Sequence, residues 1–155
     1  MIAMNEAVRL KQRLVSIFKR KGRDGRHTRL FENLDPWQKD LLSGMVPLQE
    51  EEVPVIGGVE SPEKWFLITS KRIVWLAAGK IQSIPITRVY QARMDFDSVL
   101  RSGRTKLETQ ELQVETLDDE RYTLAIEEGL PLVGVWNVLK HLGFRNRKKA
   151  DTNLA

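Results

Sequence analysis

The chain has 155 residues, of which 41% are apolar and 30% charged, and this composition is typical of one globular domain with a hydrophobic core. The absence of cysteine excludes disulfides, thiolate zinc sites and a cysteine nucleophile. The sequence has neither a run of about 18 apolar residues nor an apolar signal segment, so we expect a cytoplasmic protein.

The net charge of +4 is the sum of blocks of alternating sign. Residues 1–30 carry nine Lys or Arg against two acids, and residues 31–63 carry eight acids against one Lys. Residues 64–106 carry nine cations against two acids, residues 107–128 carry eight acids against one Arg, and the tail is basic again. Blocks of opposite sign can neutralise one another across a folded surface, so we expect solvated faces of mixed sign and no nucleic-acid partner.

The first predicted element is a basic amphipathic helix over residues 3–21. Its apolar residues recur at spacings of three and four, which places them on one stripe of a helix. These residues are Ala3, Ala7, Leu10, Leu14, Ile17 and Phe18. The cations that lie mostly off this stripe are Arg9, Lys11, Arg13, Lys19 and Arg20.

The next segment, residues 21–29, contains two glycines and no apolar residue, so it is predicted to be a mobile linker. Asp35-Pro36 resembles a helix N-cap followed by proline in the first helical position, which predicts a short helix through Leu42 that ends near Gly44. Residues 1–44 are therefore predicted to form a helical arm outside the sheet.

From Val53 onward, Pro, Gly and β-branched residues separate short apolar runs, which is typical of strands. Strands are predicted at 53–59, 65–69, 72–77, 80–84, 86–96, 107–116 and 121–127. In the fifth strand, alternation predicts that Tyr90 and Ala92 face the core, and in the seventh it predicts the same of Leu124 and Ile126.

The last predicted element is a helix over residues 131–142, which begins at Pro131 and ends at Gly143. Its apolar stripe predicts that it packs on the sheet. Residues 145–155 are predicted to be a polar, basic and frayed tail. Strands in series followed by one helix indicate an α+β domain over residues 45–144 with antiparallel pairing, because parallel strands need long crossovers.

Two segments resemble those of bacterial pleckstrin-homology-like (PH-like) and GRAM-like domains. Residues 65–75, WFLITSKRIVW, resemble a hairpin with Thr and Arg around its turn, and residues 84–89, IPITRV, resemble the strand that follows it. The resemblance covers residues 45–143. It implies a partly open antiparallel β-barrel of about seven strands with a C-terminal capping helix, and it implies little about function.

Packing arguments explain part of this hairpin without the family. Ser70-Lys71 is predicted to connect two strands, and the stem of Arg72 is expected to cover apolar surface. Trp65 and Trp75 are expected near opposite ends of a cross-strand pair, where aromatic packing adds about 0.5–1.5 kcal/mol.

No catalytic signature or cofactor motif occurs in the sequence. His27 is expected in the linker and His141 on the exposed side of the last helix, and neither has acids at the spacing of a metal site or triad. Asp95 and Asp97 share a strand face, but solvation at a strand end explains them better than catalysis does. We therefore expect no catalytic residue, metal or cofactor.

Phosphoinositide binding is the first activity that a PH-like fold suggests. Lipid-binding members carry cations around the first hairpin loop, whereas residues 60–64 of this chain include two acids and one Lys. The more basic loop is 98–106, where Arg101, Arg104 and Lys106 could contact an anionic surface.

The N-terminal helix is the best candidate for a functional surface. It could pack on its own domain or a second copy, bind a partner, or lie on an anionic membrane. Its single aromatic residue, Phe18, favours packing on protein over insertion into a bilayer. We therefore expect a non-enzymatic interaction module that binds a protein partner, as a regulatory adaptor or an inhibitory, immunity-type protein. The alternative is a module peripheral to the inner membrane that binds anionic lipid. The candidate binding residues are Arg9, Lys11, Arg13, Phe18, Lys19, Arg20, Arg101, Arg104 and Lys106.

Overall fold

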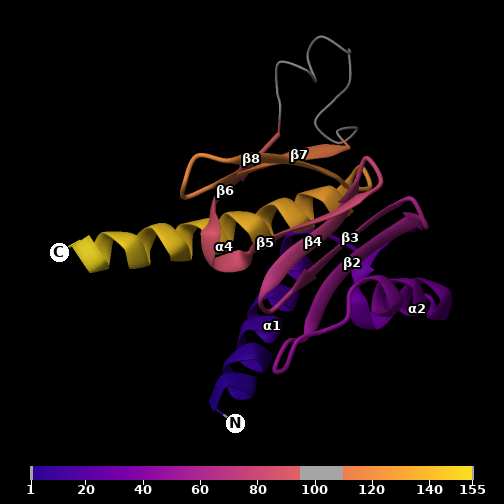
Figure 1. Ribbon diagram of the computed structural model, residues 1–155, viewed down its shortest axis with the longest axis horizontal. Helices are drawn as coiled ribbons and strands as arrows, with labels where there is room; N and C mark the ends of the chain where they lie inside the picture. The colour runs from indigo at the N-terminus through magenta and orange to yellow at the C-terminus, as the bar shows by residue number, and fades with distance from the viewer. Residues whose placement is uncertain (1, 95–109, 155) are drawn as a thin grey trace.

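A computed structural model describes residues 2–94 and 110–154 of the protein (Figure 1). In these ranges the helices are α1 (Ile2–Lys21), α2 (Pro36–Met45) and α4 (Leu130–Leu154), with 3-10 turns η1 (Phe31–Asn33) and η2 (Ile86–Arg88). The strands are β1 (Thr28–Leu30), β2 (Pro54–Ser61), β3 (Lys64–Thr69), β4 (Arg72–Ala77), β5 (Lys80–Pro85), β6 (Val89–Arg93), β7 (Glu111–Thr116) and β8 (Arg121–Ala125).

The strands form two antiparallel sheets, and the predicted α+β class is confirmed. The first sheet has the strand order β1-β2-β3-β4-β5 and the second has the order β6-β7-β8. Hydrogen bonds among the described residues give these two sheets and no closed barrel. Helix α4 packs along the second sheet, and α1 packs against α4 and β2 (Figure 1).

The central strands of the first sheet are buried on both faces. In β3 every residue after Lys64 is buried, which explains its continuous apolar sequence. Phe66 and Trp75 face the main core, which the second sheet, α1 and α4 complete, whereas Trp65 faces a smaller core under α2. The expected Trp65–Trp75 pairing is therefore wrong, because the two rings lie on opposite faces. Trp75 is instead opposite Phe66 and packs edge-on against Tyr122, with ring centroids 5.3 Å apart.

The predicted Ser70-Lys71 connection between β3 and β4 is confirmed, and a buried carboxylate organises it. The Thr69 hydroxyl donates to Glu52 at 2.6 Å and accepts the amide N–H groups of Lys71 and Arg72. The Arg72 side chain pairs with Glu52 at 2.9 Å. Burial raises the pKa of the Glu52 carboxyl, but hydrogen bonds from Arg72, the Gln49 amide and Thr69 outweigh it, so this pKa lies below its ordinary value.

The predicted mobile linker and separate helical arm are wrong. Thr28–Leu30 forms β1, which pairs with β2. The Glu127 carboxylate accepts the backbone N–H groups of Arg26, His27 and Thr28 at 2.8, 2.6 and 2.9 Å. The segment is thus fixed by hydrogen bonds to a residue about 100 positions away, and its own composition gives no sign of them.

The predicted fifth strand, 86–96, is divided. Its first residues form the turn η2, and β6 begins only at Val89. A register shift between Val89 and Gln91 changes the alternation, so Val89 and Ala92 are buried while Tyr90 is 40% exposed. The expectation that Tyr90 faces the core is wrong, whereas Leu124 and Ile126 are buried as predicted. Residues 95–96 and 107–109 of the predicted strands lie outside the described residues.

The last helix is longer than predicted, because α4 runs through Gly143 to Leu154. A Cβ atom on Gly143 would lie 2.3 Å from the Tyr90 carbonyl oxygen, so this glycine permits close packing on β6 instead of ending the helix. The predicted frayed tail is therefore wrong over residues 145–154. Asn146 anchors this part of the helix by donating to the carbonyl oxygens of Ile86 and Val89, both at 2.8 Å.

Candidate functional site

Helices α1 and α4 cross where two glycines face each other. A Cβ atom on Gly22 would lie 2.5 Å from the Gly134 Cα atom, and one on Gly134 would lie 2.7 Å from the Phe18 ring. Only glycine at these positions allows the helices to approach so closely. From this crossing the N-terminal half of α1 and the C-terminal half of α4 diverge (Figure 1).

The space between the diverging halves is a cleft, here named the terminal-helix cleft. Its inner part, with a volume of about 380 Å³, lies between α1, α4 and the β3–β4 turn. Its outer part is a groove of about 510 Å³. Arg145 and Lys149 of α4 line both parts, so the two hollows adjoin. The outer groove is lined by Arg13, His141, Phe144, Arg145, Lys148, Lys149 and Thr152.

Most charges of the sheets are neutralised by ion pairs between the blocks of opposite sign. The pairs that link different blocks include Arg29–Asp35, Arg72–Glu52, Arg88–Asp118 and Arg93–Glu115. By contrast, four cations of the terminal-helix cleft form no ion pair with any described carboxylate. They are Arg13, Arg145, Lys148 and Lys149.

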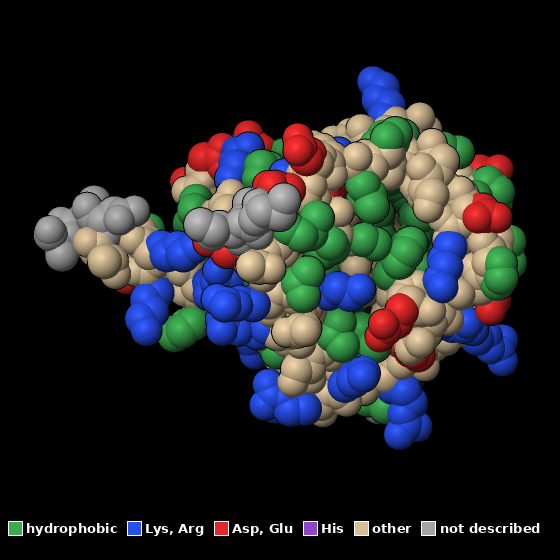
Figure 2. Space-filling view, turned by 90° about the horizontal axis from the view of Figure 1, so that it is seen from below, with side chains coloured by type: hydrophobic (Ala, Val, Ile, Leu, Met, Phe, Trp, Pro, Cys, Tyr) green, Lys and Arg blue, Asp and Glu red, His purple; other side chains and the backbone are tan. Residues whose placement is uncertain are grey.

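The surplus positive charge is thus concentrated on the terminal helices. Figure 2 shows Lys and Arg side chains crowded at the end of the molecule from which α4 projects. Positive charge that the protein does not neutralise internally is available to an anionic partner.

His141 lies in the outer groove with its Nε2 atom buried and without a hydrogen-bond partner among the described residues. It is partly buried, so its expected position on the exposed side of the helix is wrong. Burial, and then the nearby charges of Arg13 and Arg145, lower the pKa of the imidazole. This environment favours the neutral form of the imidazole.

One large apolar side chain borders the same groove. Phe144 is 59% exposed, the largest exposed fraction among the large hydrophobic residues of the described chain. The sequence interpretation missed Phe144, Arg145, Lys148 and Lys149 because it ended the helix at Gly143. The spacing of residues 141, 145, 148 and 152 is that of one helical stripe, and it could have indicated a common face.

The structure separates the candidate binding residues of the N-terminal helix. Of its cations, Arg13 lines the outer groove, while Arg9, Lys19 and Arg20 are exposed elsewhere on α1 and Lys11 is partly buried. Phe18 is only 1% exposed and belongs to the main core, so its predicted contact with a partner is wrong. Its stripe instead docks α1 on its own domain, the first of the alternatives that the sequence allowed. Arg101, Arg104 and Lys106 lie outside the described residues.

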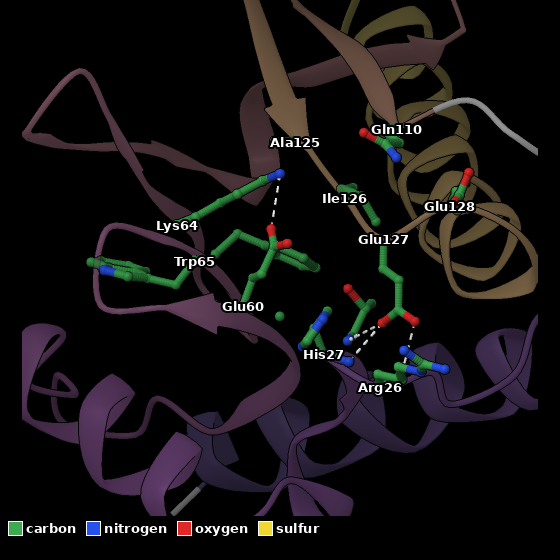
Figure 3. A pocket seen from close by; sticks show the side chains of 13 residues that line it. Arg26, His27, Glu60, Lys64, Trp65, Gln110, Ala125, Ile126, Glu127 and Glu128 are labelled. Carbon is green, nitrogen blue, oxygen red and sulfur yellow. Dashed lines mark hydrogen bonds and ion pairs between the residues drawn. The ribbon is translucent and has the colours of Figure 1, made fainter.

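Outside the cleft, another hollow of about 400 Å³ lies between the β2–β3 hairpin and β8 (Figure 3). Three of its charged groups have partners, since Lys64 pairs with Glu60 at 2.9 Å and Glu127 accepts the three backbone N–H groups described above. Burial raises the pKa of the Glu127 carboxyl, but these backbone donors outweigh it and the pKa is lowered. Because the carboxylates of Glu60, Glu127 and Glu128 line this hollow, it is unfavourable for an anionic ligand.

The described residues contain no group of three or more His, Asp or Glu side chains placed to hold a metal ion. No helix in the same part of the chain is long and apolar enough to cross a bilayer. No family model, curated protein or solved structure matches the chain.

Proposed function

We propose that the protein is a non-enzymatic PH-like interaction module that binds a protein partner through the terminal-helix cleft. The order of elements supports the PH-like part of this proposal, since β2 to β8 follow one another in two antiparallel sheets and α4 comes after all of them. Strand β1 and the helices α1 and α2 are then additions to that order.

The observation that carries the binding role is the unneutralised positive charge around a concave site. Arg13 on one wall and Arg145 and Lys148 on the other have no described carboxylate as partner, whereas most cations of the sheets do. Like charges held in one cleft cost free energy that an anionic partner would relieve. These features of the cleft support its role as a binding site for an anionic protein partner.

The same cleft does not favour catalysis. A general base or nucleophile is usually oriented by a second polar group, as a carboxylate orients histidine in a catalytic triad. The charged neighbours of His141 are Arg13 and Arg145, and no described carboxylate lines its groove.

Peripheral binding to an anionic membrane is the second candidate, and the projecting end of α4 favours it. Exposed Phe144 lies near Arg147, Lys148 and Lys149 on that helix, and such a combination of apolar and basic residues suits a membrane interface. We rank it second because a flat bilayer cannot enter a concave cleft.

Co-purification from the native host tests the proposal. The double variant Arg13→Glu/Arg145→Glu should lose a partner that the unchanged protein retains. The matched control is Lys80→Glu/Arg121→Glu, which makes the same change of net charge at exposed positions of the first and second sheets and should retain the partner. If both variants captured the partner equally well, the cleft would not be the binding site. Sedimentation with anionic vesicles that is lost only in the cleft variant would favour the membrane alternative instead.

A further inference from the structure

The side chains of the terminal-helix cleft specify the chemistry of a segment that would fill it. Arg13 projects from α1, and Arg145 and Lys148 project from α4, so both walls of the outer groove are positive. A neutral or basic segment would leave these cations facing one another. Carboxylates between the walls would form charge-assisted hydrogen bonds with both, which are stronger than neutral ones.

His141 adds a second requirement to the same groove. Its Nε2 atom is buried and unpartnered, and the charged groups that face it are Arg13 from α1 and Arg145 from its own helix. A carboxylate placed beside these guanidinium groups would offset their charge and stabilise the protonated imidazole. Binding of an acidic group would therefore be accompanied by uptake of a proton.

Phe144 supplies an apolar contact beside the charges. Its exposed ring borders the groove, and burying it under an apolar side chain of a partner would contribute to affinity through the area removed from water. Glu6 and Glu51 line the inner part of the cleft, whereas no described carboxylate lines the outer groove, so the acidic side chains belong in the outer groove. With a volume of about 510 Å³, this groove is large enough for several side chains and much larger than a single phosphate group needs.

We infer that the occupant of the cleft is an acidic segment of a protein, with carboxylates that pair with Arg13 and Arg145 beside His141 and a neighbouring apolar side chain that covers Phe144. This inference rests on the proposed function and specifies its partner. Because the complex takes up a proton at His141, its affinity rises as the pH falls through the range in which imidazole titrates, about pH 7 to 5.

The test uses two synthetic probes of equal length, Glu-Asp-Phe-Glu-Asp-Leu and the uncharged Gln-Asn-Phe-Gln-Asn-Leu, titrated into the whole protein and followed by NMR. The acidic peptide should shift the signals of the cleft and raise the pKa of His141 at concentrations up to about 1 mM, the range of weak peptide binding. The uncharged peptide should not. His27, the other histidine of the chain, is the internal control and should not respond.

Four variants test the site. Arg145→Gln should weaken binding of the acidic peptide by about tenfold, the size expected for loss of one charge-assisted pair. Phe144→Ala should weaken it about threefold to tenfold for the lost apolar contact. Arg121→Gln should leave the affinity unchanged, because this exposed residue belongs to the second sheet. His141→Gln should retain binding but remove its dependence on pH between about 7 and 5.

The possible failures separate the two proposals. Equal binding of both peptides, no binding at about 1 mM, or saturation of the site by inorganic phosphate or anionic vesicles would overturn the inference. If a co-purified partner needs the cleft but binds it through a segment without acids, the inference fails and the proposed function stands. If the acidic peptide binds but the Arg13→Glu/Arg145→Glu variant still co-purifies with every partner of the unchanged protein, the proposed function fails instead.

Discussion

Glu127 should hold the N-terminal segment on the rest of the domain, and Glu127→Gln tests this. The carboxylate accepts three backbone N–H groups at 2.6–2.9 Å. The amide would keep one acceptor oxygen for His27 and Thr28, but its NH₂ group would face the N–H of Arg26. Losing one hydrogen bond to a charged acceptor costs about 1.5–3 kcal/mol, and weakening two others adds about 0.5 kcal/mol each, so we expect a loss of stability of about 2.5–4 kcal/mol.

The loss of stability in Glu127→Gln should depend on pH. The pKa of Glu127 is lower in the folded protein than its ordinary value of 4.5, so the stability it contributes is complete above that value and is lost as pH falls through the folded pKa. The difference in stability between the variant and the unchanged protein should therefore be full near pH 7 and should shrink as the pH falls below 4.5.

Urea unfolding at neutral and acid pH measures both quantities. Glu128→Gln is the matched control, because Glu128 is an exposed neighbour that accepts no hydrogen bond from the described residues, and it should change stability by less than about 0.5 kcal/mol. If Glu127→Gln were as stable as the unchanged protein at pH 7, or equally destabilised at all pH values, Glu127 would not be the anchor described here.

Three further predictions concern the helices and the first sheet, and thermal or urea unfolding checks each. Gly134→Ala should lower the free energy of unfolding by about 1–3 kcal/mol, because its Cβ would meet Phe18 and Gly22. Gly44→Ala should raise it by up to about 1 kcal/mol, because the space around Gly44 is open. Equal effects of the two substitutions would contradict the close crossing of α1 and α4. Arg72→Met should lower the free energy of unfolding by about 2–4 kcal/mol at neutral pH, because it leaves the Glu52 carboxylate buried without its cation. The loss should be smaller at acid pH, where Glu52 is protonated. A loss that is the same at both pH values would mean that the substitution removes only packing. Asn146→Ala should lose about 1–3 kcal/mol by leaving two carbonyl groups without their donor, and an unchanged stability would show that the end of α4 is not anchored there.

The correct sequence predictions rest on local patterns. The stripes of α1 and α4 follow the helical period, and most strands are short apolar runs between turns. The stripes also predicted which face of each helix packs on the domain, since Leu14 and Leu139 on these stripes are buried.

The errors arise where distant contacts decide the conformation. No local pattern connects residues 26–28 to Glu127, so a fixed segment resembled a linker. Gly143 has the sequence signature of a helix end, but its role is the close approach of α4 to Tyr90. Because of that error, the basic side of α4 was missed, and the candidate site was placed on α1 and the 98–106 loop.

Site-specific photo-cross-linking in the native host tests the central claim most directly. A photoreactive amino acid replaces Phe144 in the terminal-helix cleft or, as control, Leu117, which lies in the β7–β8 turn and is 44% exposed. We predict one protein adduct at position 144, absent at position 117 and suppressed when Arg13 and Arg145 are changed to Glu. Adducts of equal yield at both positions, or an adduct at position 144 that survives charge reversal, would contradict the account.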